Sequence, residues 1–526
     1  MRWNRATRAS VGVGFVMLWT VGSAGAQAAA TGDKLKASRL SLTVYSHADP
    51  AKFDPGQHAR NRGGSSIFSG GRMETAPGFG VVRDTRTLHL DAGLNSITLT
   101  DVAAQIDPTS VALTQIGDDR QPIEMTFGVL DQSFEFDLVS FYSVMDKYVD
   151  QPIVVRQSHA DGTVDHIAGT LLSADDGLIL GTEKGLRVLR GGSDNDIELG
   201  QLPQGLRTRP TLIWRLRADE AGPRDVQMRY LTDGMTWRTD YSLVVDDTNT
   251  SGELSAWVTL LNLSGASYPD ADLKLIAGDV QRLGVERDRG GGGSSLFGDT
   301  EDDSFEQKPF GEYHLYTLGR TVTLPDRSTQ QITLFPPKPA VRVEKILVYY
   351  GLPQRHRGFS PRPNFDSDIR DPSYPKVDVY LRMMNQEDAG LGLPLPAGKV
   401  RVFQRDVADG ALEFMGEDVI PHTPVGRDAS VRIGSSFDVT GQRLQTEFEI
   451  DRRSRWMEET IEITLQNAKA EDVEVIVKEN LYRWVNWEII AAQQDHEKID
   501  SRTIHFPVSV PAGGTTKFTY TVKYTW

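Results

Sequence analysis

The chain has 526 residues, of which 39% are hydrophobic, a formal net charge of −15 and no cysteine. This length exceeds what one hydrophobic core usually organises, so we expect several domains. The acidic balance argues against nucleic acid and anionic membrane surfaces as partners, although acids spread along a chain also serve solubility alone. The lack of cysteine excludes disulfides, thiol nucleophiles, Cys-ligated metals and a lipoprotein acyl anchor.

The first 26 residues have the three parts of a secretory signal peptide. Arg2, Arg5 and Arg8 form a basic start, an apolar run covers 11–21, and small residues at 24–26 form a cleavage site. The apolar run is too short to span a bilayer, no later run approaches 18 residues, and no twin-arginine pair is present. We therefore predict export by the general secretory route to the periplasm without a transmembrane anchor, and we leave peripheral association with the outer membrane open. Cleavage would leave 54 Lys and Arg against 72 Asp and Glu, a net charge of −18.

Two segments interrupt the regular pattern of the chain. Residues 52–80 are rich in Gly, Ser and Arg, and residues 283–308 contain a run of four glycines followed by acidic residues. Neither segment has apolar periodicity, and no Lys-Ser or Lys-Thr pair follows the glycines as a phosphate-binding loop requires. We predict an N-terminal β domain over 27–130 with a flexible insert at 52–80, and a disordered loop at 283–308.

The region 131–205 is predicted to hold one helix and a small β-barrel. Asp137 is a plausible N-cap for the helix, and apolar residues then recur at three- and four-residue spacing on one face: Leu138, Phe141, Tyr142, Met145 and Tyr148. Short strands are expected at 153–155, 164–173, 178–180 and 186–189, with Asp-Gly turn signals between them. The pattern is typical of an SH3-type or Sm-type barrel. Its many acidic residues favour a structural or protein-contact module over RNA binding.

The rest of the chain alternates apolar and polar residues with period two. Examples are Val226, Met228 and Tyr230, and later Ile461, Ile463 and Leu465. Strands with one buried face have this pattern, and no series of helices separates them. The sequence therefore predicts a mainly β protein of several antiparallel β-sandwich or immunoglobulin-like domains, with a central sandwich region at 206–440 and a C-terminal immunoglobulin-like domain at 441–526.

The search for catalytic motifs gives little. There is no G-x-S-x-G elbow and no H-E-x-x-H helix, and none of the ten histidines is paired at metal-ligand spacing. We expect no cofactor and no metal, and we identify no catalytic residue. His422 lies between two prolines, which stiffen the backbone around a titratable ring. A local hydrogen-bonding role for His422 is favoured over catalysis, and a contact with a ligand or partner is the alternative.

An aromatic cluster near the C-terminus is a second candidate contact site. Tyr482, Trp484 and Trp487 place three large rings within six residues, beside Arg483. Exposed rings with neighbouring hydrogen-bonding groups can bind a sugar face or anchor a partner protein. The favoured alternative is that the rings fill a sandwich core or a joint between domains.

Six stretches of the sequence are informative when they are taken together. They are 82–88 (VRDTRTL), 230–241 (YLTDGMTWRTDY), 258–280 (VTLLNLSGASYPDADLKLIAGDV), 392–400 (GLPLPAGKV), His422-Thr423-Pro424 and the Arg483-Trp484 region. Together they resemble a family of secreted bacterial proteins that shares the domain of unknown function 4139 and includes the mucoidy-inhibitor-like proteins. The resemblance implies a β-rich envelope protein and gives no catalytic residues. The mucoidy-inhibitor-like members carry a long coiled coil, which this sequence lacks.

Taken together, the sequence predicts an exported envelope protein that binds or scaffolds envelope proteins or glycans without catalysis. One alternative is a hydrolase acting on envelope polysaccharide, and another is an assembly factor associated with the outer membrane. An enzyme should hold convergent carboxylates with shifted pKa values in one cleft. A scaffold should show broad apolar or aromatic patches.

Overall fold

The computed structural model describes most of the chain from residue 35 onwards. The described residues are 35–46, 53, 78–158, 163–175, 177–189, 195–203, 205–278, 280, 306–310, 313–352, 362–366 and 374–526. The predicted leader lies outside them, as do most of the two predicted flexible segments. The ends of those two segments are strands, because Phe79 begins β2 and Glu306 begins β16.

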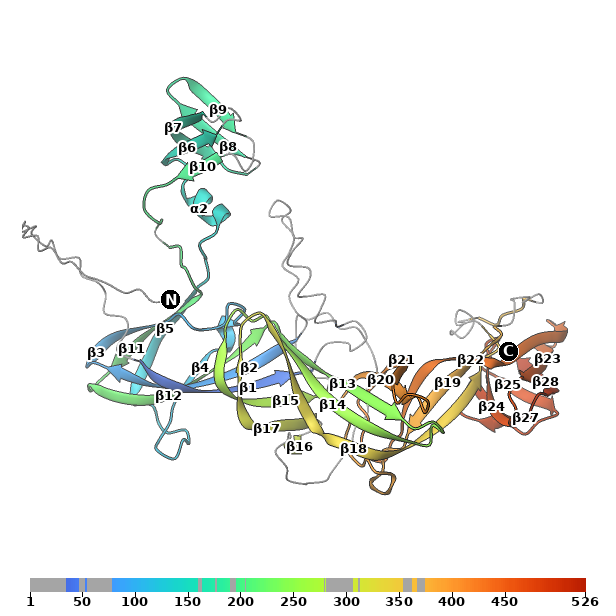
Figure 1. Ribbon diagram of the computed structural model, residues 1–526. Coiled ribbons are helices and arrows are strands. Elements are labelled where there is room, and N and C mark those ends of the chain that lie inside the picture. The colour runs from blue at the N-terminus through green and yellow to red at the C-terminus, as the bar shows by residue number, and fades with distance from the viewer. Residues whose placement is uncertain are drawn as a thin grey trace, which may run out of the picture.

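The protein is mainly β, with 65% of residues in strands and 3% in helices, as the sequence predicts. A seven-stranded sheet, in the order β16-β17-β15-β1-β2-β12-β4, forms its N-terminal part (Figure 1). Within it β1 runs parallel to β15 and antiparallel to β2. The strands are β1 Leu35–Tyr45, β2 Phe79–Leu90, β4 Ala112–Gln115, β12 Gly222–Asp233, β15 Tyr268–Ala277, β16 Glu306–Phe310 and β17 Tyr313–Leu324.

A three-stranded sheet of order β3-β11-β5 packs on the same core as the seven-stranded sheet. Its strands are β3 Gly93–Leu99, β11 Thr211–Ala218 and β5 Phe127–Glu135. Trp214 on β11 and Leu42 on β1 both belong to this first core and are almost fully buried. A 3-10 turn, η2, covers Pro108–Ser110.

The remaining strands form one thirteen-stranded sheet. They are β13 Met235–Val245, β14 Ser251–Asn262, β18 Ser328–Tyr349, β19 Lys376–Met383, β20 Gly398–Arg405, β21 Leu412–Ile420, β22 Ala429–Asp451, β23 Trp456–Asn467, β24 Val473–Asn480, β25 Trp487–Ala492, β26 Glu497–Lys498, β27 Thr503–Val510 and β28 Thr515–Thr525, with the 3-10 turn η4 at Glu387–Ala389. The main path runs β21-β20-β13-β14-β18-β19-β22-β23-β28-β25, and β24 pairs with β18 and β27. The long strands β18 and β22 connect the two ends of this elongated sheet (Figure 1).

Two large cores lie along the molecule. The first core is shared by the seven-stranded sheet, the three-stranded sheet and the nearer strands of the thirteen-stranded sheet. The C-terminal core is built from β23, β24, β27 and β28 and from parts of β18, β19 and β22. Strand pairing therefore crosses the predicted boundaries at residues 130 and 440, because β1 and β2 pair with β15 and β12 and because β22 spans residue 440.

The small β unit, formed by the described residues within 141–198, stands away from the other three sheets (Figure 1). It consists of α2 Phe141–Lys147 and a five-stranded sheet of order β10-β6-β7-β8-β9, with β6 Pro152–Ser158, β7 Val164–Ser173, β8 Leu178–Thr182, β9 Gly185–Leu189 and β10 Asn195–Glu198. The expected helix N-cap was wrong, because Ser140 and not Asp137 caps α2 through a reciprocal bond with Ser143.

The apolar stripe of α2 is only partly used for packing. Met145 and Tyr148 are buried in the core of the small β unit, whereas Phe141 is 52% exposed. Helix periodicity predicts which side chains share one face of α2. It does not predict how many of them the neighbouring sheet will cover. No helix in the described part of the chain is long and apolar enough to cross a membrane.

Candidate functional site

The C-terminal residues that the sequence singled out lie mostly inside the protein. Tyr482 is 7% exposed and Arg483 is fully buried at the edge of the C-terminal core. The Arg483 Nε donates to Glu459 Oε2 at 2.7 Å, and its Nη2 donates to Gln445 Oε1 at 2.8 Å. Its guanidinium also lies 4.4 Å from the centre of the Phe448 ring. The buried guanidinium of Arg483 thus has a carboxylate, an amide oxygen and an aromatic ring as partners.

A second buried ion pair lies beside the first. The Arg443 Nε donates to Glu479 Oε2 at 3.0 Å, and the Tyr520 hydroxyl donates to the same oxygen at 2.7 Å. Tyr524 donates to Glu459 Oε1 at 3.0 Å. Burial raises the pKa of Glu479, and the Arg443 charge opposes that rise without cancelling it. Burial also raises the pKa of Tyr520 and Tyr524 well above the usual tyrosine range.

Period-two alternation explains how these charges come to lie in the core. Glu459 falls on the inward face of β23 with Ile461, and Glu479 falls on the inward face of β24 with Val477. Each carboxylate is therefore buried by the same alternation that buries its apolar neighbours, and each needs a buried partner. The buried arginines supply that partner. The arrangement stabilises one packing of the C-terminal core and offers no open carboxylate to a substrate.

Arg483 also holds a loop against the C-terminal core. Its Nη1 donates to the backbone oxygens of Asn364 at 3.2 Å and Asp366 at 2.7 Å. Between them, the Phe365 ring packs against Trp526, with 4.7 Å between the ring centres. Arg483 thus links the loop at 362–366 to Glu459 of β23 and Gln445 of β22.

The two predicted tryptophans are half-buried against the C-terminal core. The Trp487 Nε1 donates to the backbone oxygen of Ser501 at 2.7 Å, and the Lys498 ammonium lies 4.4 Å from the centre of its ring. Trp484 packs on the same core. In the part of the chain that the structure describes, the aromatic cluster is thus used for packing and for joining loops.

His422 lies in another part of the thirteen-stranded sheet, after β21. Its Nδ1 accepts a hydrogen bond from the backbone N–H of Ala397 at 3.0 Å. The neighbouring Thr423 exchanges two backbone hydrogen bonds with Leu395, both at 2.8 Å. The ring therefore fixes the turn before β20 against the turn after β21, and it is not part of the network around Arg483.

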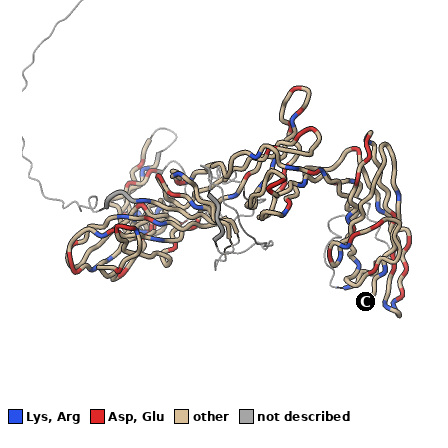
Figure 2. The backbone as a smooth tube through the Cα atoms, turned by 90° about the horizontal axis from the view of Figure 1, so that it is seen from below, with Lys and Arg blue, Asp and Glu red and all other residues tan. Residues whose placement is uncertain are grey.

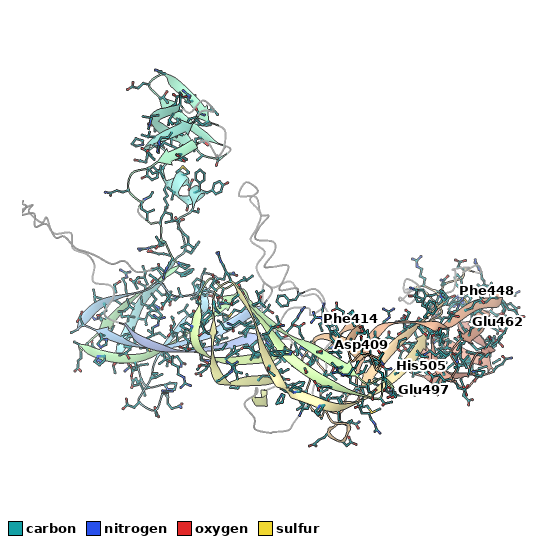
Figure 3. The ribbon with its side chains drawn as sticks, viewed as in Figure 1. Asp409, Phe414, Phe448, Glu462, Glu497 and His505 are labelled. Carbon is teal, nitrogen blue, oxygen red and sulfur yellow. The ribbon has the colours of Figure 1, made fainter. Side chains whose placement is uncertain are left out.

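The half-buried histidine of β27, His505, gives a testable pH dependence. Partial burial, followed by the charge of Lys478, lowers the pKa of His505, and the charges of Glu497 and Asp500 oppose this shift. His505 on β27 is the cross-strand partner of Glu497 on β26 (Figure 3). The unfolded chain then binds the proton more tightly than the folded protein does, so the free energy of unfolding falls as the pH drops below about 6.5. We expect His505→Asn to reduce the loss of thermal stability between about pH 7 and pH 5. Melting temperatures across that range test this.

The control for this prediction is His496→Asn, because His496 is exposed. We expect its pH dependence to match that of the unmodified protein. If both variants lost the same share of the pH dependence, burial of His505 would not be its cause.

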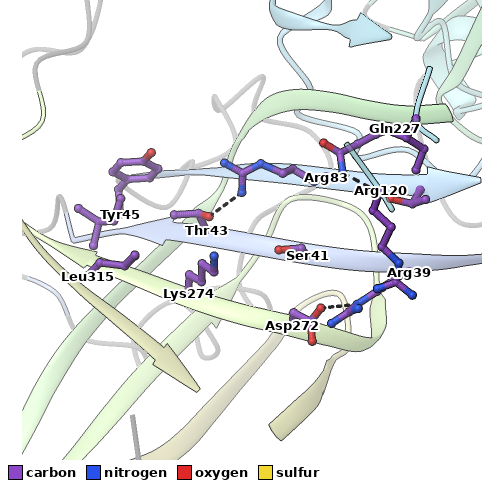
Figure 4. A pocket seen from close by; sticks show the side chains of 13 residues that line it. Arg39, Ser41, Thr43, Tyr45, Arg83, Arg120, Gln227, Asp272, Lys274 and Leu315 are labelled. Carbon is purple, nitrogen blue, oxygen red and sulfur yellow. Dashed lines mark hydrogen bonds and ion pairs between the residues drawn. The ribbon is translucent and has the colours of Figure 1, made fainter. Parts of the chain in front are cut away.

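One open site in the described part of the chain is a groove on the outer face of the seven-stranded sheet, with a volume of about 320 Å³ (Figure 4). We call it the anion groove because most of the charged side chains that line it are cationic. Alternate residues of β1 face it, while Leu42 and Val44 between them face the first core. Because β1 lies between β2 and β15, each row across the groove has one residue from each strand. One such row is Arg83, Ser41 and Asp272. The lining residues are Arg39, Ser41, Thr43, Tyr45, Arg83, Thr85, Ile116, Arg120, Gln227, Asp272, Lys274, Ile276 and Leu315.

The charge of this anion groove is opposite to that of the whole chain. Four cationic side chains and one carboxylate line it, whereas the chain has a net charge of −15. Elsewhere the two signs are interspersed along the strands (Figure 2). The single carboxylate, Asp272, accepts a hydrogen bond from Arg39 Nε at 2.7 Å, and this bond together with the Asp272 charge raises the pKa of Arg39. Arg83, Arg120 and Lys274 are left without a carboxylate partner among the described residues.

Hydrogen bonds within the anion groove hold its side chains without neutralising them. The Arg83 Nη1 donates to the Thr43 hydroxyl at 3.2 Å. At one end the Tyr45 ring stacks on Phe79, with 4.4 Å between the ring centres. Burial raises the pKa of the Tyr45 hydroxyl, and the Arg83 charge opposes that rise. The groove therefore combines fixed positive charge with a rigid apolar end, which suits reversible binding of an anion.

The anion groove was missed at the sequence level. The alternation of Arg39, Ser41 and Thr43 with apolar neighbours predicts only that these side chains share one face. Arg83 and Lys274 come from strands far away in the sequence, and only strand pairing brings them beside Thr43. Neither a protein-family model nor a curated protein sequence matches this chain.

Proposed function

We propose that this protein is exported into the envelope of a Gram-negative-type cell and acts there by binding, as a scaffold for an envelope protein or glycan. In this proposal it is a member of the family with domain of unknown function 4139 that lacks the coiled coil. The signal-peptide pattern and the six resembling stretches support these two parts.

The observation that carries the binding role is the anion groove. Three cations that have no carboxylate partner among the described residues line one depression in an otherwise acidic protein. Unneutralised charges of one sign attract and orient ligands of the other sign. The ligand in this proposal is therefore a negatively charged component of the envelope.

A hydrolase that acts on envelope polysaccharide is less well supported. Such an enzyme needs two carboxyl groups that reach the scissile bond. Within the described ranges, Glu479 is the carboxyl group whose pKa burial raises, and it is fully buried and paired with Arg443. The anion groove supplies one carboxylate, Asp272, and it is paired with Arg39.

Export is tested by expressing the full chain with its own N-terminus in a Gram-negative host. We expect the protein in the osmotic-shock fraction, with a mass that corresponds to cleavage after Ala26. Intact-mass spectrometry of each cell fraction measures both. Full-length protein confined to the cytoplasm would overturn the export part of the proposal.

Binding is tested by sedimenting the purified protein with isolated envelopes. We expect the double variant Arg83→Ala/Lys274→Ala to weaken association about tenfold, the equivalent of roughly 1.4 kcal/mol. Added salt should also weaken association of the unmodified protein. The matched control, Arg217→Ala/Lys345→Ala, removes two exposed cations outside the anion groove and should bind as the unmodified protein does. Equal binding by both double variants would overturn the role of the anion groove.

A further inference from the structure

The polar lining of the anion groove is unbalanced between donors and acceptors. Arg39, Arg83, Arg120 and Lys274 can only donate hydrogen bonds, and Asp272 is the one side chain in the lining that can only accept them. Its carboxylate is already engaged by Arg39. The hydroxyl groups of Ser41, Thr43 and Thr85 can donate as well, and the Thr43 oxygen already accepts from Arg83.

The excess of hydrogen-bond donors over acceptors in the groove favours some classes of ligand over others. A sugar hydroxyl both donates and accepts hydrogen bonds. A neutral sugar would find its acceptors mainly at the hydroxyl oxygens of Ser41 and Thr85 and at the Gln227 amide oxygen, and it would leave the four cationic donors with weaker partners than an anion offers. A phosphoryl group carries three strong acceptor oxygens and nearly two negative charges, and arginine and lysine both bind it well. A carboxylate has two oxygens and one charge. The number of unpaired donors therefore favours a phosphoryl group.

The end of the anion groove that contains Tyr45 is apolar. Ile276 and Leu315 face each other across β15 and β17 and are 3% and 5% exposed. Tyr45 is the cross-strand partner of Ile276 and lies at the same end of the groove as Leu315 (Figure 4). Its ring is held by stacking on Phe79. Arg83 lies close enough to Tyr45 for its charge to oppose the rise that burial causes in the pKa of the Tyr45 hydroxyl. A ligand that spans the groove must then carry its charge at one end and an apolar group at the other.

We propose that the anion groove binds a phosphate ester, with the phosphoryl group between Arg83 and Lys274 and an apolar ester group against Tyr45 and Leu315. The volume of about 320 Å³ is at the lower limit for small-molecule sites, which suits a phosphoryl group with a short chain or a single ring. This inference rests on the proposed function in one respect, which is that the anion groove is the ligand site.

The test is calorimetric titration of the full mature chain with phenyl phosphate at pH 7.5. We expect phenyl phosphate to bind at least about tenfold more tightly than benzoate, which keeps the ring but replaces the phosphoryl group by a carboxylate. We also expect it to bind more tightly than inorganic phosphate, which lacks the apolar group. Equal affinity for benzoate and phenyl phosphate would overturn the inference.

Variants separate the two ends of the ligand. Lys274→Met should weaken phenyl phosphate and inorganic phosphate by similar factors, because it removes a charge that both ligands use. Leu315→Ala should weaken phenyl phosphate and leave inorganic phosphate unchanged, because it removes only an apolar contact. Arg217→Met is the control and should change neither affinity. A Lys274→Met protein that melts normally and binds both ligands as before would overturn the inference.

A vesicle arm distinguishes a lipid headgroup from a soluble ester. If the natural ester is a lipid, vesicles that contain phosphatidic acid should bind the protein and compete with phenyl phosphate, while phosphatidylcholine vesicles should do neither. Binding of phenyl phosphate without vesicle binding assigns the groove to a soluble ester. If no phosphate compound binds but envelopes still bind through Arg83 and Lys274, the inference fails and the proposed function stands.

Discussion

Replacing Arg483 by methionine should lower the free energy of unfolding of the C-terminal part by about 3–5 kcal/mol, because it leaves the buried Glu459 carboxylate without its cation. Both side chains are almost completely buried, and their Nε and Oε2 atoms are 2.7 Å apart. The change also releases the backbone oxygens of Asn364 and Asp366. Hydrogen exchange of the β23 and β28 amides measures the effect within the C-terminal core.

Two further variants test whether the effect comes from the buried charge pair. Arg453→Met changes an exposed arginine in the turn before β23 and should shift stability by no more than about 0.5 kcal/mol. The double variant Arg483→Met/Glu459→Gln removes the uncompensated charge, so it should be more stable than Arg483→Met alone. A double variant less stable than the single one would show that charge pairing is not what Arg483 contributes.

Replacing Trp237 by alanine should destabilise the first core by about 3–5 kcal/mol, since it opens a large cavity that the surrounding strands cannot fill. Trp237 on β13 is fully buried, and its Nε1 donates to the backbone oxygen of Val44 on β1 at 3.1 Å. Its ring also meets Tyr316 on β17 edge-on, with 6.3 Å between the ring centres. One side chain thus connects the seven-stranded and thirteen-stranded sheets.

The expected readout is loss of amide protection in β1 and β13 with β23 and β28 nearly unchanged, because the two cores are separate clusters. Trp257→Ala on β14 is the matched control, since Trp257 is 43% exposed and fills no cavity. Its effect should be much smaller. Equal losses for the two tryptophan variants would contradict the packing role of Trp237.

The buried ion pairs of the C-terminal core show what alternation along a strand can predict and what it cannot. Alternation placed Ile461 and Ile463 on the buried face of one strand, and the structure confirms that both are fully buried. By the same alternation Glu459 should also face inward, which is where it lies. The pattern could not show that Arg483 would satisfy it, because residues 459 and 483 meet only when β23 packs against the segment after β24.

The same limit applied to the open site. The sequence drew attention to Tyr482, Trp484 and Trp487 because aromatic residues close together in the chain are conspicuous. The structure uses them for packing and places the unneutralised charge on β1, β2 and β15 instead. Those strands are separated by long stretches of chain, so no local pattern contains Arg83 and Lys274 together.

The sequence by itself determined the mainly β class, the inward and outward faces of the strands, and the helix with its small β unit. These features follow from local spacing, since side chains alternate along a strand and repeat every three to four residues along a helix. Only the tertiary structure decided which strands are neighbours. Strand pairing in turn decided that the two cores do not follow the predicted domain boundaries. It also placed Arg83, Lys274 and Arg120 in one groove. Strand pairing depends on contacts between distant segments, which the spacing of residues within one segment does not encode.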